Sequence, residues 1–160
     1  MKALLDKVKL FVLDMDGTFY LGDRRIDGAL DFIHKVKETG RDFIFFTNNS
    51  SKNGSMYIEK LAAMDCPITK DQIMTSGDVT AAYLKSKYPE KKVYLVGSPA
   101  LEAVFREEGI CLTEEKPEVV VIGFDMTLTY EKLERACTYI REGAVFLATH
   151  KDINLSLIHI

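Results

Sequence analysis

Two aspartates, Asp14 and Asp16, stand one residue apart directly after the apolar run LFVL at 10–13. Ligands of open parallel sheets bind outside the carboxyl ends of the strands, so this spacing would bring two carboxylates to the mouth of such a sheet. Both cannot be buried without partners, because desolvating an unpaired charge costs too much. A bound divalent cation resolves this conflict, and Mg²⁺ prefers hard oxygen ligands. The cation would also let one carboxylate approach an anionic phosphate group.

A second polar segment follows another apolar run. FIFF at 43–46 is followed by TNNSS at 47–51, which begins with Thr47 and Asn48. A hydroxyl, two amides and the N-terminus of the next helix would converge beside the aspartates, and such groups bind phosphate well. A nucleophile with a metal on one strand and an oxyanion site on the next is the arrangement that phosphoryl transfer needs.

The elements that must hold these residues alternate between strand and helix. Short runs rich in Val, Ile and Phe predict strands buried on both faces, as in a parallel sheet covered by helices, at 10–13, 43–46, 73–75, 93–96, 119–122 and 144–148. Helical spacing between them predicts helices over 28–39, 53–64, 79–87, 98–109 and 129–143. The predicted fold class is therefore α/β, with a doubly wound (Rossmann-like) parallel sheet. TSGD at 75–78 is the best place for a boundary, which gives domains over 1–75 and 76–160.

Capping residues indicate where these helices begin. Ser98, followed by a proline, and Thr129 are suitable N-caps. Asp78 is expected to cap the helix over 79–87, and Ser50 or Ser51 the helix over 53–64.

Composition excludes several classes of protein. Hydrophobic residues make up 47% and charged residues 28% of the 160, which is enough apolar material for a core. No apolar run approaches the roughly 18 residues that span a bilayer, and residues 1–13 lack a signal-peptide core, so a cytoplasmic protein without a membrane partner is expected. The 21 basic and 24 acidic residues are dispersed, which argues against nucleic acid as a partner.

Two motifs resemble those of a known family. FVLDMDGT at 11–18 resembles the first motif of the haloacid dehalogenase superfamily, and FFTNNSS at 45–51 resembles the second. The stretch from Asp14 through Gly22, together with IDGA at 26–29, is similar to the NagD-like, p-nitrophenylphosphatase-type branch (subclass IIA). VYLVGSPAL, PEVVVIGFD and AVFLATH resemble the cap domain of that branch. The resemblance runs from residue 10 to about 154 and implies a Rossmann-like core followed by an incomplete α/β cap, beginning near Ser76.

The resemblance implies a Mg²⁺-dependent phosphomonoester hydrolase that acts on small phosphorylated metabolites. Asp14 would be the nucleophile that forms an aspartyl-phosphate, and one of its oxygens would bind Mg²⁺. Asp16 would protonate the leaving alcohol and later activate water, while its backbone carbonyl touches the metal. Thr47 would hydrogen-bond the transferring phosphoryl group, and Asn48 would contribute its backbone N–H. Residues 18–26 would form a mobile turn and small hairpin.

The sequence also departs from the family. Its third motif, a lysine, and its fourth, acidic motif both follow the cap, and this sequence ends within the cap, so no residue is assigned to either role. HKD at 150–152 stands where the branch usually has Asn-Pro-Asp, and LSLIHI at 155–160 does not align. We expect a truncated or frame-shifted reading frame with a foreign tail, and impaired activity. The run at 10–13 should have an open edge that invites aggregation or pairing with another chain.

Other interpretations stay open at this point. Asp14 and Asp16 could be solvated turn acids, the TNN segment a helix-capping turn, and Asp125 is best read as a turn residue. Alternative functions are a receiver-like module that accepts phosphate without turnover, or an inert fragment. The substrate classes left open are sugar phosphates, nucleotide monophosphates and two- or three-carbon phosphates. Relatives of the NagD-like branch often pair through the cap, so a homo-oligomer is a further expectation.

Overall fold

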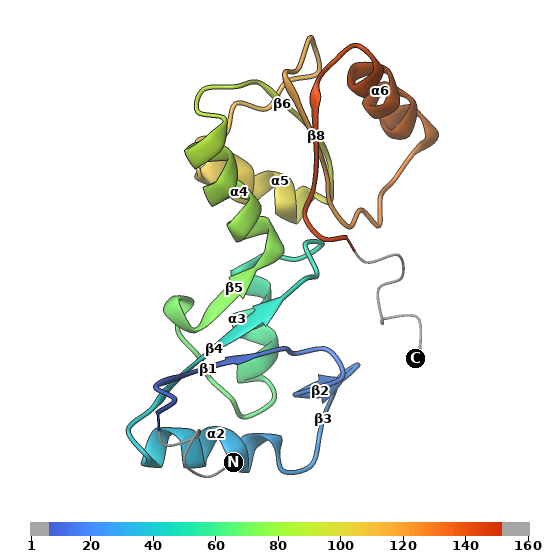
Figure 1. Cartoon of the computed structure of the whole chain (residues 1–160). Helices are drawn as coiled ribbons and strands as arrows, with labels where there is room; N and C mark the ends of the chain where they lie inside the picture. The colour runs from blue at the N-terminus through green and yellow to red at the C-terminus, as the bar shows by residue number, and fades with distance from the viewer. Residues whose placement is uncertain (1–6, 152–160) are drawn as a thin grey trace. The chain divides into compact units, whose positions relative to one another are not determined.

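The computed structural model describes residues 7–151, in which strands and helices alternate as the sequence predicts (Figure 1). The predicted foreign tail at 155–160 lies outside the described residues. Contacts divide the described chain into two units: the first holds 7–47 and 54–74, and the second holds 48–53 and 75–151. The predicted α/β class is confirmed, since both units contain parallel strands and helices.

The first unit is built on a sheet in the order β1-β4-β5, in which β1 and β4 are parallel. The pairing runs from Leu10 opposite Asp42 to Leu13 opposite Phe45, so both strands deliver their carboxyl ends to the same edge. The elements of this unit are β1 (Leu10–Leu13), the hairpin of β2 (Tyr20–Leu21) and β3 (Arg24–Arg25), α2 (Ala29–Glu38), β4 (Asp42–Thr47), α3 (Gly54–Ala62), the 3₁₀ helix η1 (Lys70–Gln72) and β5 (Ile73–Thr75).

One hydrophobic cluster fills this unit. Phe43 and Phe45 of β4 pack with Ile33 of α2 and Leu61 of α3, and all four are at most 2% exposed. The ring of Phe19 meets that of Phe45 edge-on, with 5.0 Å between the centroids. This contact ties the segment after β1 to the strand beside it, so the loop that carries the aspartates rests on the core.

The second unit is a parallel sheet in the order β6-β7-β8, covered on both faces. Its elements are α4 (Ser76–Lys87), β6 (Val93–Val96), α5 (Pro99–Glu107), β7 (Val119–Ile122), α6 (Tyr130–Arg141) and β8 (Val145–Ala148). Val119 and Val121 pack with α4 and α5, whereas Val120 packs with α6 on the other face (Figure 1). The alternation follows from the pleat, which points successive side chains to opposite faces. Among residues 7–151, no helix is long and apolar enough to cross a membrane.

Two predicted caps are confirmed and two are wrong. The hydroxyls of Ser98 and Thr129 accept N–H groups at the starts of α5 and α6. Asp78 is not an N-cap, because α4 begins earlier: Thr75 caps it, and the Asp78 carboxylate completes a capping box by accepting the N–H of Thr75 at 2.7 Å. The serines at 50 and 51 do not cap α3, which begins only at Gly54.

The prediction of strands buried on both faces is wrong for β1 and β8. Leu10 and Val12 are 52% and 64% exposed, and Phe146 of β8 is 54% exposed. Within residues 7–151, both strands lie at an edge of their sheet and pair with one neighbour, and the open edge expected for the run at 10–13 is confirmed. Apolar runs without alternation therefore indicated parallel strands correctly, but they did not distinguish central strands from edge strands.

Candidate active site

The chain turns sharply after β1, and Met15 anchors the turn. Its side chain is fully buried, and its carbonyl oxygen accepts the N–H groups of residues 18–20 at 2.9–3.2 Å. Gly17 adopts a φ of 80°, a conformation that a residue with a Cβ rarely tolerates. Because Met15 occupies the core, its neighbours can reach water: Asp14 is exposed and Asp16 is half-buried.

The two aspartates have different surroundings. Asp14 accepts a long hydrogen bond of 3.5 Å from the hydroxyl of Thr18. Asp16 forms an isolated β-bridge with Tyr20 and is hydrogen-bonded to its phenol. Burial raises the pKa of Tyr20 well above its usual value, and the charge of Asp16 raises it further. The phenol therefore stays protonated at physiological pH and remains a donor to Asp16.

Thr47 is the last residue of β4 and is 1% exposed. The phenol of Tyr57, from α3, lies close to it and is equally buried. Burial and the charge of Asp16 raise the pKa of Tyr57, while its interaction with Thr47 acts in the opposite direction. Asp16 and Thr47 therefore both influence the pKa of this phenol. The structure brings these two predicted site residues, from neighbouring strands, to one place.

Tyr20 and Tyr57 were not among the predicted site residues. Both belong to the hydrophobic cluster of the first unit, and buried aromatic residues are usually explained by packing alone. For Tyr20, the signal that could have found it is the phenolic oxygen, which needs a polar partner when the ring is buried. Tyr20 was easier to find than Tyr57, because it lies only four residues beyond Asp16 in the sequence.

Asn48 follows Thr47 in the chain and opens a turn. Its side chain is exposed, and its carbonyl oxygen accepts the hydroxyl of Ser76 at 2.8 Å. The buried side chain of Asn49 accepts the N–H and the hydroxyl of Ser51 at 2.9 and 2.7 Å. The turn is therefore stabilised by Ser76 and by its own side chains, and it does not cap α3. That the N–H of Asn48 binds phosphate stays a prediction.

The aspartates offer the donor atoms that were expected for a metal. Mg²⁺ is commonly bound by one or two carboxylates and keeps several water molecules, so Asp14 and Asp16 fit it. Within the range 7–151, no group of three or more Asp, Glu, His or Cys side chains is placed to hold a metal ion.

Asp125, at the carboxyl end of β7, is a turn residue as predicted. Its carboxylate accepts the N–H and hydroxyl of Thr127 at 2.8 and 2.6 Å and the ammonium group of Lys132 at 2.7 Å. Burial acts to raise the pKa of Asp125, but the hydrogen bonds from Lys132 and Thr127 outweigh it and leave the pKa below its usual value. This side chain stabilises the loop before α6.

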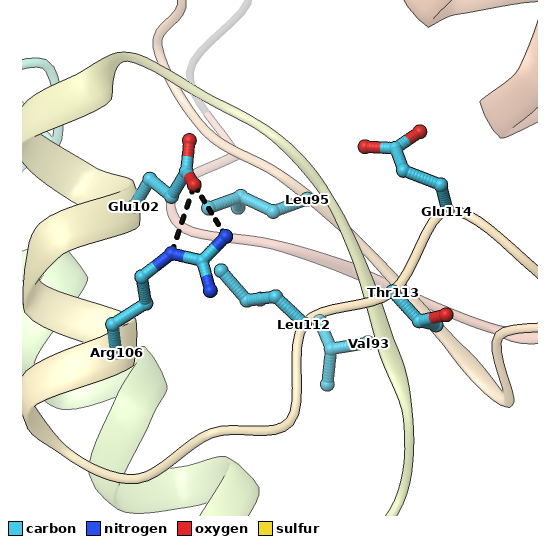
Figure 2. A pocket seen from close by; sticks show the side chains of 7 residues that line it. All are labelled: Val93, Leu95, Glu102, Arg106, Leu112, Thr113 and Glu114. Carbon is cyan, nitrogen blue, oxygen red and sulfur yellow. Dashed lines mark hydrogen bonds and ion pairs between the residues drawn. The ribbon is translucent and has the colours of Figure 1, made fainter.

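Figure 2 shows a pocket in the second unit that does not belong to this site. It has a volume of about 120 Å³ and contains an ion pair in which the guanidinium of Arg106 donates twice to Glu102, at 2.9 and 2.7 Å. Pockets for small molecules usually enclose roughly 300–1,000 Å³, so this one is too small for a typical metabolite. It is lined by Val93, Leu95, Glu102, Arg106, Leu112, Thr113 and Glu114.

Residues 11–111 match the family of haloacid dehalogenase-like hydrolases, and the chain belongs to this family. The 5′-nucleotidase YutF of Bacillus subtilis (strain 168) is 34% identical over 145 residues, which cover 91% of this chain and 57% of that protein. The acid sugar phosphatase of Staphylococcus aureus (strain USA300) is 35% identical over 152 residues, which cover 94% of this chain and 59% of that protein. The crystal structure of a 4-nitrophenylphosphatase from Thermotoga maritima matches with a TM-score of 0.91 and 45% sequence identity. The match covers 95% of this chain and 58% of that chain.

These similarities confirm the family and the branch that the motifs predicted. A 4-nitrophenylphosphatase is among the similar structures, as expected for the p-nitrophenylphosphatase-type branch. The chain spans 57–59% of the length of these three relatives. The similarity extends across residues of both units, since it includes more than nine tenths of this chain.

Proposed function

We propose that this chain carries the nucleophile and the phosphate-binding residues of a Mg²⁺-dependent phosphomonoester hydrolase. The observation that carries the proposal is the parallel pairing of β1 with β4, which brings the loop of Asp14 and Asp16 and the end of β4 at Thr47 to the same edge of the sheet. Asp14 stands exposed on the same loop, where a substrate could reach it. The family match supports the same reaction class, since the relatives are named as phosphatases or as a nucleotidase.

The reaction would proceed in two displacements. A carboxylate oxygen of Asp14 attacks the phosphorus atom, the bond to the ester oxygen breaks, and Asp16 gives a proton to the leaving alcohol. Asp16, now ionised, takes a proton from water, which attacks the aspartyl-phosphate and releases inorganic phosphate. Thr47 and the N–H of Asn48 hold the phosphoryl oxygens. Bound Mg²⁺, held by Asp14 and Asp16, would offset the repulsion between the nucleophile and the anionic substrate.

The surroundings of the aspartates fit these two roles. An exposed carboxylate with one long hydrogen bond is accessible as a nucleophile, as Asp14 is. An acid–base group must be held in one orientation, and the buried phenol of Tyr20 holds Asp16. These surroundings therefore support Asp14 as the nucleophile and Asp16 as the proton donor.

The proposed substrates are small phosphomonoesters. The relatives carry the names of a 5′-nucleotidase, an acid sugar phosphatase and a 4-nitrophenylphosphatase, which share a phosphomonoester but little else. A cytoplasmic location, a homo-oligomer, and a division into a core over 1–75 and a cap over 76–160 complete the proposal.

The test is phosphate release from p-nitrophenyl phosphate by the full chain, with and without Mg²⁺, beside the Asp14→Asn variant. The proposal expects release that EDTA and the substitution both abolish, because the amide is neither a nucleophile nor an anionic ligand. Glu38→Gln, which removes an exposed carboxylate from α2, is the matched control and should retain the wild-type rate. Equal rates for wild type and Asp14→Asn would refute the proposal.

A further inference from the structure

The turn at 48–53 belongs to the second unit, although its neighbours on both sides in the chain belong to the first. Most of the hydrogen bonds that hold it to that unit join a side chain to a backbone group, and such bonds fix the path of the main chain. This assignment matters because the turn begins with Asn48, whose N–H is proposed to bind phosphate. Whatever holds the turn also holds that N–H.

Ser50 is the centre of these contacts. It is fully buried, and its Oγ accepts the N–H of Phe124 at 2.9 Å and shares a hydrogen bond of 2.9 Å with Oγ1 of Thr149. Phe124 and Thr149 come just after β7 and β8, so one hydroxyl ties the turn to the ends of two parallel strands. A buried hydroxyl with two partners defines a position far better than a solvated one.

Two further serines hold the turn on either side of Ser50. Ser76, the first residue of α4, donates its hydroxyl to the carbonyl oxygen of Asn48 at 2.8 Å. Ser98, the N-cap of α5, donates to the carbonyl oxygen of Ser51 at 2.8 Å, in a buried position. The carbonyls at the two ends of the segment 48–51 are therefore oriented by side chains of the second unit.

Glycine at 123 makes the approach to Ser50 possible. A Cβ at Gly123 would lie 3.0 Å from Oγ of Ser50 and 2.5 Å from Cδ2 of Leu101. Leu101 is 1% exposed and cannot move aside easily, because a Cβ at Gly77 or Gly97 would also meet it within 3 Å. The absence of a side chain at Gly123 therefore lets the backbone after β7 lie close to Ser50 in the turn.

We propose that Ser50 and Ser76 are positioning residues for phosphate binding: their hydroxyls hold the backbone from Asn48 to Ser51 so that the N–H of Asn48 is preset for a phosphoryl oxygen. This inference rests on the proposed function and extends it to two serines outside the reacting groups. Neither serine touches the substrate in this proposal. Their effect is on affinity, since an ordered turn loses less conformational entropy when the phosphate binds.

The test measures the turn and phosphate binding separately, in the full chain labelled with ¹⁵N. Amide hydrogen exchange of residues 48–51 reports the order of the turn, and titration with inorganic phosphate in the presence of Mg²⁺ reports affinity. Ser50→Ala and Ser76→Ala each remove one hydroxyl. Thr138→Ala is the matched control, because Thr138 also donates its hydroxyl to a backbone carbonyl, that of Glu134, but within α6.

Both serine variants should speed exchange at 48–51 and weaken phosphate binding by about fivefold, the worth of one hydrogen bond, while Thr138→Ala changes neither. Unchanged exchange in both variants overturns the proposal, and so does faster exchange with unchanged affinity. Far-UV circular dichroism identifies a variant that fails to fold. If one serine variant does not fold, the result for the other serine variant tests the proposal. If wild type binds no phosphate, the proposed function fails, whereas exchange still shows whether the serines order the turn.

Discussion

The ammonium group of Lys60 lies 4.0 Å from the centre of the Tyr20 ring, whose phenol is hydrogen-bonded to Asp16. A cation over an aromatic face contributes about 0.5–2 kcal/mol, depending on how far both are desolvated. Lys60 is also 3.7 Å from the carboxylate of Asp23. The orientation of Asp16 therefore depends on a ring that is itself fixed by a helix side chain.

Replacing Tyr20 with phenylalanine tests this arrangement. Tyr20→Phe keeps the ring and the contact with Lys60 but removes the donor to Asp16, so kcat for p-nitrophenyl phosphate should fall about tenfold while KM stays within about twofold. Tyr130→Phe is the control, because Tyr130 is 83% exposed and lies in α6. Steady-state kinetics of the three proteins decide the question, and an unchanged kcat for Tyr20→Phe would remove the tyrosine from the mechanism.

A methyl group at position 123 should destabilise the second unit. Gly123→Ala places a Cβ against Leu101 and Ser50, and overpacking of this kind costs about 1–3 kcal/mol. The free energy of unfolding from urea titration provides the measurement. Gly109→Ala is not a useful control, since its φ of 75° adds strain of another kind. The additional substitution Leu101→Ala opens space for the methyl group, so in that background Gly123→Ala should cost less; an equal cost would contradict the packing argument.

The stability of the loop before α6 should depend on pH in the acid range. The pKa of Asp125 is lower in the folded chain than its ordinary value of 3.8, so its ionised form stabilises the fold above that pH. This contribution is lost as the pH falls through the lowered folded pKa. Asp125→Asn should reduce the free energy of unfolding at pH 7 by about 1–3 kcal/mol and flatten its dependence on pH below 4. Glu102→Gln, which breaks an exposed ion pair, should have little effect.

The exposed side chains of β1 predict self-association. Leu10 and Val12 are more than half exposed on an edge strand, and such strands pair with other chains unless charges protect them. Val12→Lys should lower the sedimentation coefficient or the loss to aggregation, with a melting temperature close to that of wild type. Glu38→Gln changes the net charge by the same amount without touching β1 and should not reduce association. A monomeric wild-type chain would refute this prediction.

Local signals in the sequence predicted most of the fold correctly. Ser98 and Thr129 could be identified as caps because an N-cap acts on residues two or three positions away. Asp78 was misassigned because a capping box uses two polar residues, and only the pairing with Thr75 shows which one is the cap. The pattern of the run at 10–13 did not predict the exposure of Val12, because strand order in a sheet depends on contacts distant in sequence; the open edge of this strand was expected only from the resemblance to the family.

In the candidate site, too, some residues could be predicted from the sequence and others could not. Asp14, Asp16 and Thr47 follow apolar runs directly, so their place at strand ends could be read from the sequence. Asp16 has the phenol of Tyr20, from β2, as its partner, and a pair of this kind forms only when the chain folds. For Ser50, sequence reasoning suggested a local cap, whereas its partners Phe124 and Thr149 lie far along the chain.

Because the second unit recruits residues 48–53, it is not a module that a contiguous gene segment can encode. A chimaera that exchanged only 75–151 for the equivalent stretch of another family member would leave Ser50 facing foreign partners in place of Phe124 and Thr149. Compatible exchanges must carry the short turn along with the larger stretch. In evolution, recombination between family members would therefore succeed most often where both pieces are inherited from the same parent.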